Sequence, residues 1–547
     1  MKQAYDSFVR DSLPAAALLP EFLFDLPKFD YPERLNAAAE LVDRAVTDGD
    51  GHRVAIRNDT GQITYAELSA LSGRIARLLV ERQGLIAGNR VLLCGANSAM
   101  LFASWLAILK AGGIAVSVMP LLRAREIATI LGKAQVSHAI VDQRLRVEVE
   151  TAATATGRVL RLLSYDGDVG GGEVERLAEG VTPLVPVCTH RDDPALIAFT
   201  SGTTGEPKGC IQFHRDILIP ADGYARHVLG LTTDDVVTSS APIAFTFGLG
   251  ALLIFPLRAR ATAVTIERGT PAALLETIER HGVTALFTAP TAYKEMLDMI
   301  DPGRLASLRL CISAGEHLPA ATWHQWHDKT GIGIIDGLGA TEMMHVFISA
   351  AKDAIRPGAT GRVVPGYEAC VLDEDGVPQS HGTGRLAVKG PTGCRYLADP
   401  RQAAYVHAGW NITGDTYRLD DNGYYWYIAR SDDMIVSSGY NIAAPEVESA
   451  LLTHSSVMEC AVVGIPCPKR GQMVKAFVIT RGEPSGDLMT VLKNHVKSQI
   501  APYKYPRIIE FVDELPKTAT GKLQRRALRT IVDSDEQSGN HPPEHCA

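Results

Sequence analysis

The sequence alternates short apolar segments of β-strand character with segments of helical periodicity. Strands are predicted at 90–94, 114–118, 284–287 and 308–313, and a helix at 100–110 separates the first two. Two strands joined by a helix bury their apolar faces together when the strands lie parallel in one sheet and the helix covers it. The alternation therefore predicts an α/β fold with largely parallel sheets.

This pattern extends over too long a chain for one hydrophobic core, because 547 residues are expected to form two or three domains. Between about 361 and 427, short strands separated by turns at 373–376 and 420–423 predict a β-rich subdomain. Alternation of strands and helices then resumes. We expect a large N-terminal domain of layered α/β subdomains plus the β-rich subdomain at 1–431, a small mobile C-terminal α/β domain at 432–532, and a disordered tail at 533–547.

Bulk composition excludes few functions. The net charge of −8 argues against general binding of nucleic acids, whose phosphates select basic surfaces. The nine cysteines form no Cys-x-x-Cys pair and no Cys/His spacing typical of zinc, which predicts reduced thiols.

The most apolar stretch, 99–122, has the composition of a membrane span but not its continuity. Lys110, the Gly112-Gly113 pair and Pro120 divide it into pieces too short to cross a bilayer. The N-terminal segment also lacks the apolar run of a signal peptide. We therefore expect a cytoplasmic protein without a membrane span.

The most specific local motif is Thr-Ser-Gly-Thr-Thr-Gly-Glu-Pro-Lys-Gly at 200–209, which follows a predicted strand at 195–199. Its glycines let backbone N–H groups turn toward one point, its hydroxyl groups add donors, and its lysine adds positive charge. A flexible, solvated turn is the alternative interpretation. The pattern predicts a polyphosphate loop formed by Thr200, Ser201, Gly202, Thr203, Thr204, Gly205 and Lys208.

A P-loop nucleotidase is excluded by the same segment. Starting from Gly202, that motif requires glycine, lysine and a hydroxyl residue at 207–209. The chain has Pro207, Lys208 and Gly209 there.

Four further motifs follow the loop: Gly-Leu-Gly-Ala-Thr-Glu at 337–342, Thr-Gly-Asp at 413–415, Arg-Ser-Asp-Asp at 430–433 with Ser-Gly-Tyr at 438–440, and Pro-Lys-Thr-Ala-Thr-Gly-Lys-Leu-Gln-Arg at 516–525. In this order, the five motifs resemble the signatures of the adenylate-forming superfamily, which includes acyl- and aryl-CoA synthetases, peptide-synthetase adenylation domains and luciferases. The resemblance covers about residues 50 to 530. It implies that ATP and Mg²⁺ activate a carboxylate as an acyl adenylate and that coenzyme A accepts the acyl group.

The resemblance also implies roles for residues at the nucleotide. Glu342 corresponds to the residue that binds Mg²⁺, and Thr341 to the one that contacts the α-phosphate. Lys522 corresponds to a catalytic lysine, whose charge would offset the repulsion between the attacking carboxylate and the phosphate. Taken alone, each residue also fits an ordinary solvated loop.

The resemblance also assigns residues of this chain to the nucleoside contacts and to the domain rotation of the family. Asp415 resembles the aspartate that binds the ribose hydroxyls, with Arg430 on the same side, and Gly315 and Glu316 resemble part of the segment against which the adenine packs. The resemblance places the hinge at Asp432 and brings Gly439 toward the pantetheine thiol after rotation. A simple turn is the alternative for Gly439.

The candidate acid pocket begins in the segment 241–250, which resembles the family motif lining the acyl pocket and thiol channel. Many relatives have a histidine where this chain has Phe245, which removes a polar group from that position. Two phenylalanines and nearby glycines would form an apolar slot for a flat ring, although ordinary core packing explains them equally well. The candidate pocket residues are Ala241, Phe245, Phe247, Gly337, Gly339 and His345. His345 either touches a ring substituent or is a buried structural histidine.

The strings at 339–347, 393–398, 437–442 and 500–506 make the chain most similar to the benzoate-CoA ligase group, especially its 2-aminobenzoate-CoA ligases. The resemblance implies a small aromatic acid, ATP and coenzyme A as partners, no nucleic acid, and a monomer or homodimer. An acyl-AMP ligase that loads a carrier protein, a ligase for a short or medium aliphatic acid, and a catalytically silent homologue remain alternatives.

Overall fold

The computed structural model describes residues 5–167, 171–200, 206–430, 434–437, 440–467, 471–484, 486–500, 502–517 and 523–529. The chain forms two compact units. The larger comprises Met1–Ala369 and Ala387–Ile412, and the smaller comprises Cys370–Leu386 and Thr413–Ala547. The predicted α/β class is confirmed, whereas the predicted boundary at 431/432 and the predicted tail lie outside the described residues.

A six-stranded sheet of the larger unit carries the phosphate loop. Its order is β6 (Arg161–Tyr165), β5 (His138–Asp142), β3 (Arg90–Cys94), β4 (Ile114–Val118), β7 (Pro194–Thr200) and β8 (Lys208–Phe213). The first five strands are parallel, and β8 is antiparallel to β7. The predicted strands at 90–94 and 114–118 are thus adjacent in the sheet.

Helices α4 (Ala99–Lys110), α6 (Arg146–Thr156) and α7 (Glu173–Ala178) pack on strands of this sheet, while α3 (Tyr65–Glu81) packs on α4 and α5 (Ala124–Lys133) packs on α6. All residues of α4 are buried, including Lys110, whose Nζ bonds Oδ1 of Asp43 at 2.6 Å. This helix and β4 account for the apolar stretch at 99–122. Within the described part of the chain, no helix is both long and apolar enough to cross a membrane.

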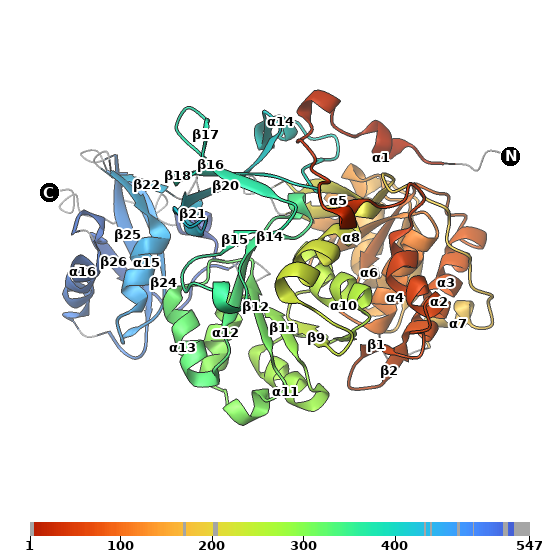
Figure 1. Cartoon of the computed structure of the whole chain (residues 1–547), viewed down its shortest axis with the longest axis horizontal. Helices are drawn as coiled ribbons and strands as arrows, with labels where there is room; N and C mark the ends of the chain where they lie inside the picture. The colour runs from red at the N-terminus through yellow and green to blue at the C-terminus, as the bar shows by residue number, and fades with distance from the viewer. Residues whose placement is uncertain are drawn as a thin grey trace. The chain divides into compact units, whose positions relative to one another are not determined.

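The second sheet has nine strands in the order β15 (Arg362–Val363), β14 (Val346–Ser349), β13 (Ile334–Gly339), β12 (Leu310–Ala314), β11 (Ala285–Thr288), β9 (Val236–Ser239), β10 (Thr262–Val264), β1 (Val54–Arg57) and β2 (Gln62–Thr64). Three helices, α11 (Pro271–His281), α12 (Pro290–Leu297) and α13 (Ala320–Thr330), lie side by side along it (Figure 1). Their apolar residues, including Leu274, Met296 and Trp326, form one core with the strands.

Two helical runs of the larger unit form its candidate acid site. The first joins α8 (His214–Pro220) to the π-helical η5 (Ala221–Leu229), and the second joins α9 (Thr246–Leu249), the π-helical η6 (Gly250–Ile254) and α10 (Phe255–Ala259). Since α10 packs on both η5 and η6, the two runs are neighbours.

The predicted β-rich subdomain is a third sheet in the order β17 (Pro378–Gln379), β16 (Glu368–Leu372), β18 (Gly382–Lys389), β20 (Trp410–Leu419) and β19 (Val406–His407), with β21 (Tyr425–Arg430) beside β20. The two predicted turns close antiparallel pairs, β16 with β17 and β20 with β21. Asp420 fixes the second turn by accepting hydrogen bonds from the backbone of Asn422 and Tyr424.

The C-terminal part of the smaller unit has the sheet order β23 (Tyr440–Ala443), β22 (Met434–Ser437), β25 (Gly471–Thr480) and β24 (Val457–Cys467), with β26 (Ile508–Phe511) parallel to β25. Helices α15 (Ala444–Leu452) and α16 (Leu488–Gln499) bury Val447, Leu451, Leu492 and Val496 against it. The strands and helices expected in this region are therefore confirmed.

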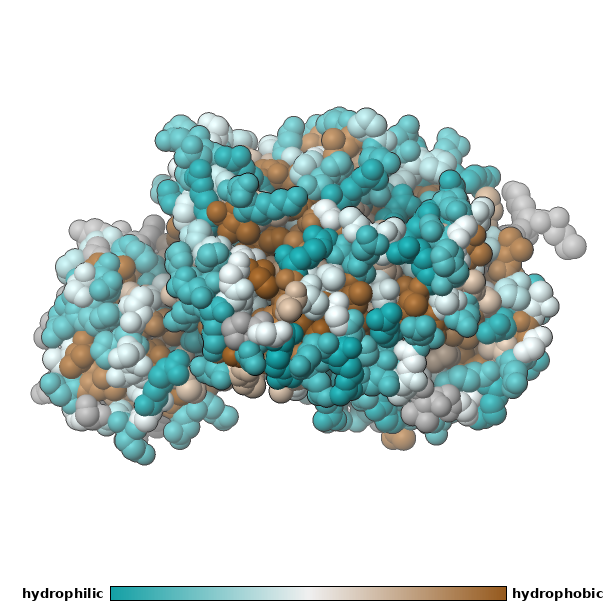
Figure 2. Space-filling view, turned by 60° about the horizontal axis from the view of Figure 1, so that its bottom comes forward, coloured by the Kyte–Doolittle hydropathy of each residue, from teal (hydrophilic) through white to brown (hydrophobic). Residues whose placement is uncertain are grey.

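No disulfide joins the described cysteines, and of these Cys188 is exposed while the others are buried. Figure 2 shows one face of the molecule, on which hydrophilic residues predominate and hydrophobic residues form small separate patches.

Candidate active site

The ends of β7 and β8 mark the candidate phosphate loop. Thr200 at the end of β7 pairs with Lys208 at the start of β8, so the segment between them joins two antiparallel strands. The hydroxyl of Thr200 is buried and has no hydrogen-bond partner among the described residues. The two flanking members of the predicted loop are thus adjacent, whereas Ser201, Gly202, Thr203, Thr204 and Gly205 lie outside the described residues.

Lys208 is linked to Glu342 through the phenol of Tyr396. Nζ of Lys208 lies 2.9 Å from the Tyr396 oxygen, and that oxygen lies 2.5 Å from Oε1 of Glu342. The direct distance from Lys208 Nζ to Oε1 of Glu342 is 4.0 Å. The lysine therefore donates to the phenol, and the phenol donates its one proton to the carboxylate.

Burial and, next, the negative charge of Glu342 raise the pKa of Tyr396 well above its ordinary value. The phenol consequently stays protonated and acts as a fixed donor at neutral pH. The neutral phenol of Tyr396 therefore lies between the ammonium of Lys208 and the carboxylate of Glu342, and all three groups lie close to the end of the phosphate loop.

Backbone pairing fixes Tyr396 beside β8. The segment 395–397 adds to the edge of this strand, where the N–H of Ile211 donates to the carbonyl of Arg395 and that of Leu397 donates to the carbonyl of Gly209, both at 2.8 Å. Oε1 of Gln402 accepts the N–H of Tyr396 at 2.9 Å.

A buried ion pair anchors the same segment. Nη1 of Arg395 bonds Oδ2 of Asp216 at 2.7 Å, and both side chains are almost completely buried. The Arg395 guanidinium also lies 4.2 Å from the ring centres of Phe22 and Phe213. The pair thus connects the Tyr396 segment to α8.

Glu342 lies in a single turn of 3-10 helix, η8 (Thr341–Met343), directly after β13. Nε2 of Gln212 on β8 donates to the carbonyl of Thr341 at 3.0 Å. Thr392 donates its hydroxyl to the carbonyl of Met343 at 2.8 Å. The strand that begins with Lys208 therefore also holds the turn that presents Thr341 and Glu342.

The candidate adenine segment follows β12. Gly315 has φ of +90°, a conformation that favours glycine, and Oε2 of Glu316 accepts the hydroxyl proton of Thr291 at 2.7 Å. Ala314 pairs with Gly337, so this segment and the start of the 337–342 motif lie on adjacent strands.

A buried carboxyl stands immediately before that motif. Asp336 on β13 is 8% exposed, and its Oδ1 has no hydrogen-bond partner among the described residues. Burial raises its pKa to about 8, although hydrogen bonds from the backbone of Gly337 and from Thr360 oppose the shift. No motif in the sequence pointed to this residue.

The candidate acid pocket is an aromatic cluster centred on His345. Ring centres of Phe255, Phe247 and Tyr224 lie 4.6, 5.7 and 5.8 Å from that of His345, and Phe287 lies 5.9 Å from Phe247. Of the predicted residues, Phe247 and His345 thus meet.

His345 is neutral and tightly held. Burial lowers its pKa to about 3, and Nε2 lies 3.4 Å from the carbonyl of Phe247. A Cβ on Gly250 would lie 2.4 Å from Cδ2 of this ring, and one on Gly339 would lie 2.9 Å from the His345 backbone. Glycine is therefore required at both positions.

Three other predicted pocket residues are Gly337, Ala241 and Phe245. A Cβ on Gly337 would lie 3.0 Å from a methyl group of Val346, and the Ala241 carbonyl accepts a hydrogen bond from Asn97 at 3.2 Å. Among the described residues no ring contact joins Phe245 to Phe247, whose ring contacts Phe287 and His345.

In the smaller unit, Asp415 on β20 pairs across the sheet with Arg430 on β21, and Oδ1 of Asp415 lies 3.2 Å from Nη1 of Arg430. Asp415 is buried, whereas the Arg430 side chain is 42% exposed. The two residues are therefore adjacent in the sheet. Asp432, Gly439 and Lys522 lie outside the described residues.

Comparison with known protein families decides the membership of the chain. The model of the AMP-binding enzyme family matches residues 42–396, and that of the AMP-binding enzyme C-terminal domain matches residues 446–522. This chain is an AMP-binding enzyme. The resemblance inferred from the motifs is thereby confirmed.

Relatives of this AMP-binding enzyme include ligases for aromatic acids. It is 39% identical to the benzoate–CoA ligase of Thauera aromatica, over 92% of this chain and 97% of the relative. It is 34% identical to the 4-hydroxybenzoate–CoA/benzoate–CoA ligase of Rhodopseudomonas palustris, over 94% and 98%.

Solved structures agree in fold over almost the whole AMP-binding enzyme. The anthranilate CoA ligase AuaEII in complex with anthranoyl-AMP matches with a TM-score of 0.88 and 34% identity, covering 94% of this chain and all of the other. A benzoate CoA ligase from Burkholderia xenovorans LB400 matches with a TM-score of 0.83 and 34% identity, covering 90% and 99%.

The sequence predicted Lys208, Thr341 and Glu342 at this site but missed Tyr396, Gln212 and Gln402. Tyr396 stood only in a string of general similarity at 393–398. Tyr396 belongs to the site through its hydrogen bond to Lys208, which is 188 positions away in the sequence. Local sequence patterns do not reveal a contact between such distant residues.

Proposed function

We propose that this AMP-binding enzyme is an aryl-CoA ligase. An oxygen of an aromatic carboxylate of the benzoate or 2-aminobenzoate type attacks the α-phosphorus of ATP, and pyrophosphate leaves. The thiol sulfur of coenzyme A then attacks the acyl carbonyl, AMP leaves, and the thiol proton passes to solvent. The observation that carries the proposal is the array of Lys208, Tyr396 and Glu342 at the ends of β8 and β13.

The phosphates are proposed to lie between the 200–205 loop and Lys208. The buried, unpartnered hydroxyl of Thr200 has one proton to donate to a phosphate oxygen. Thr341 is the candidate contact to the α-phosphate, because Gln212 holds its backbone beside β8. The ammonium of Lys208 offsets the charge that the phosphates bring.

Glu342 fits a magnesium site completed by a nucleotide. Mg²⁺ is commonly bound by one or two carboxylates together with substrate phosphates and water. No group of three metal-ligating side chains occurs in the described part of the chain. Tyr396 donates to Oε1 of Glu342, and no described residue donates a hydrogen bond to Oε2, which leaves one carboxylate oxygen for the ion. When bound, the ion would neutralise phosphate charge.

The nucleoside is proposed to contact two other places. Asp415 would accept hydrogen bonds from the ribose hydroxyls, with Arg430 orienting the carboxylate through the contact at 3.2 Å. Gly315 and Glu316 would lie against the adenine.

Lys522 is proposed to stabilise the negative charge that develops during adenylation. Asp432 is the proposed hinge between the two half-reactions, and Gly439 is the residue proposed to approach the pantetheine thiol. A boundary near 431, a cytoplasmic location and a monomer or homodimer belong to the same proposal.

The acid is proposed to bind beside Phe247 and His345. Ala241, Phe245, Gly337 and Gly339 are the other residues proposed to line its site. The cluster supplies apolar surface to a flat ring. His345 is neutral at physiological pH because its pKa is about 3, so it would not supply positive charge to the acid.

Release of AMP tests this function. Purified protein with Mg-ATP is assayed with and without coenzyme A, using benzoate, 2-aminobenzoate, 4-hydroxybenzoate and hexanoate. We expect AMP formation that depends on coenzyme A with at least one benzoate. An adenylate trapped by hydroxylamine without any turnover on coenzyme A would instead identify a carrier-protein ligase, and preference for hexanoate would reject an aromatic substrate.

A further inference from the structure

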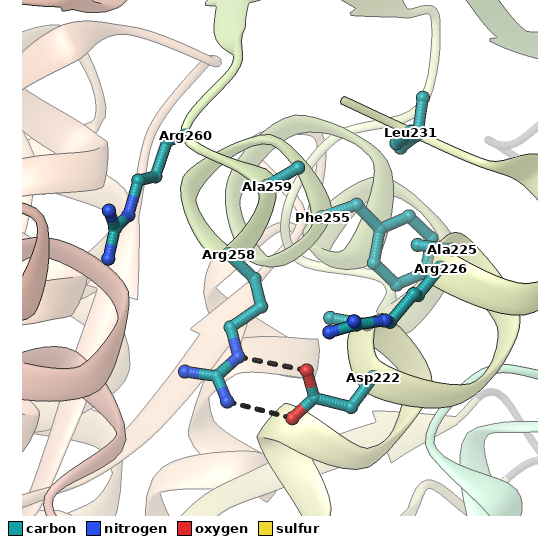
Figure 3. A pocket seen from close by; sticks show the side chains of 9 residues that line it. Asp222, Ala225, Arg226, Leu231, Phe255, Arg258, Ala259 and Arg260 are labelled. Carbon is teal, nitrogen blue, oxygen red and sulfur yellow. Dashed lines mark hydrogen bonds and ion pairs between the residues drawn. The ribbon is translucent and has the colours of Figure 1, made fainter. Parts of the chain in front are cut away.

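A pocket, named here the outer pocket, is lined by residues of η5 and α10 (Figure 3). Its volume is about 440 Å³, and Figure 3 shows side chains from both helical runs around it. Its lining includes Asp222, Arg226, Leu231, Phe255, Arg258 and Ala259.

The polar side of this pocket is rigid. Nε and Nη2 of Arg258 bond the two carboxylate oxygens of Asp222 at 3.0 and 2.9 Å, and Nη1 bonds Glu40 at 3.2 Å. Tyr31 also donates to Asp222 at 2.8 Å. The charges of Asp222 and Arg258 are thus neutralised within the protein, and the pocket keeps an open interior beside Leu231 and Ala259.

Phe255, the first residue of α10, is among the lining residues of this pocket and is itself fully buried. Its ring also contacts His345 at 4.6 Å between ring centres, and Tyr224 and Phe287 at 6.1 Å each. Phe255 therefore belongs both to the lining of the outer pocket and to the cluster proposed to bind the acid.

We propose that Phe255 is a specificity-determining residue, whose ring closes the far end of the acid site and excludes acids with chains extending beyond the aromatic ring. This inference rests on the proposed function, since it assumes that the acid lies beside His345. Replacing the ring by a small side chain joins the acid site to the outer pocket, which then accommodates an alkyl extension.

The ligands that discriminate are 3-butylbenzoate and 4-butylbenzoate compared with benzoate. A hydrophobic pocket separates ligands that differ by one methylene by about 10-fold or more, so relief of a steric block on four carbons is expected to exceed that. We expect Phe255→Ala to raise kcat/KM for one of the two butylbenzoates, relative to benzoate, at least about 10-fold over the wild type.

Three further variants complete the test. Phe102→Ala removes another fully buried phenylalanine, located on α4, and reports the general cost of a lost ring. Phe255→Leu is a milder opening if the alanine variant does not fold. The double variant Phe255→Ala with Ala259→Phe refills the outer pocket from its own lining and should abolish the gain.

Binding of each acid is also measured by calorimetry with the purified protein, independently of turnover. The proposal that Phe255 closes the acid site is supported if Phe255→Ala or Phe255→Leu improves binding or kcat/KM for a butylbenzoate. The improvement should be lost again in the double variant and be absent from Phe102→Ala. A folded Phe255 variant that binds and activates benzoate but gains on neither butylbenzoate overturns the proposal. If the wild type activates no benzoate at all, the proposed function fails. The role of Phe255 is then judged by the calorimetric comparison alone.

Discussion

The phenol oxygen of Tyr396 lies 2.5 Å from Oε1 of Glu342 and donates a hydrogen bond to that carboxylate. The same oxygen accepts a hydrogen bond from Nζ of Lys208 at 2.9 Å, so one neutral side chain lies between two charged ones. The proposed roles of Glu342 toward Mg²⁺ and of Lys208 toward phosphate both depend on this separation.

Replacing Tyr396 by phenylalanine is therefore expected to impair nucleotide use while preserving the fold. A hydrogen bond to a charged group contributes about 1.5–3 kcal/mol, which predicts a roughly 10- to 100-fold fall in kcat/KM for ATP. The Mg²⁺ concentration for half-maximal activity should rise as well. Tyr65→Phe is the matched control, because that buried phenol bonds the carbonyls of Pro256 and Ala261 instead. Equal effects of both changes on ATP use would contradict the assignment.

Lys522→Ala is expected to separate the two half-reactions. Loss of a charge that stabilises the transition state should slow adenylation about 100- to 1,000-fold. Transfer from a preformed aryl adenylate to coenzyme A should change little, as measured by thioester formation from synthetic adenylate. Lys517→Ala is the control on the same segment, since Lys517 pairs with Glu459 at 2.8 Å. Parallel losses in both half-reactions would argue against a lysine specific to adenylation.

The buried carboxyl of Asp336 makes stability depend on pH. Its pKa is raised to about 8 by burial, so the folded state holds this proton more tightly than the unfolded chain does. Stability should therefore decline as pH rises from about 4 toward 8, by at most about 1.4 kcal/mol per pH unit from this group, and level off above. Asp336→Asn should remove that decline. Denaturant unfolding of the two proteins at pH 5 and pH 8 tests the difference, and parallel curves would exclude it.

Breaking the buried ion pair between Arg395 and Asp216 is expected to be costly. Removal of one partner leaves an uncompensated charge in the interior, for which about 3–5 kcal/mol is usual. Arg395→Ala should lower the free energy of unfolding by this order. Arg44→Ala, which breaks an exposed pair with Asp48 one helical turn away, should have a much smaller effect. Chemical denaturation of both variants provides the measurement.

Elements with uninterrupted apolar runs were predicted well from sequence. The strand at 90–94 and the helix ending at Lys110 agree with β3 and α4, because complete burial leaves a continuous apolar run bounded by polar or glycine residues. Motif order, through the family resemblance, assigned Lys208 and Glu342 to one nucleotide site, and the structure has their charged atoms 4.0 Å apart.

What local pattern did not reveal depends on contacts between distant segments. Tyr396 joins the site only because 395–397 pairs with the edge of β8, and Phe255 faces His345 only because α10 packs beside η5 and η6. Burial of Asp336 had no local signal either, since a strand ending in aspartate before glycine also reads as an exposed turn.

The antiparallel pairing of β7 with β8 has one more consequence. Many phosphate loops lead from a strand into a helix, whose macrodipole contributes about half a positive charge at its N-terminus. Here the chain leaves β7 and returns as a strand that begins at Lys208, so a helix macrodipole does not follow the loop. Charge balance at a bound triphosphate must then come from discrete cations, which makes it adjustable: a lysine that arrives or departs, or that is neutralised by acylation, changes the electrostatics of the site in a way that a fixed helix end does not allow.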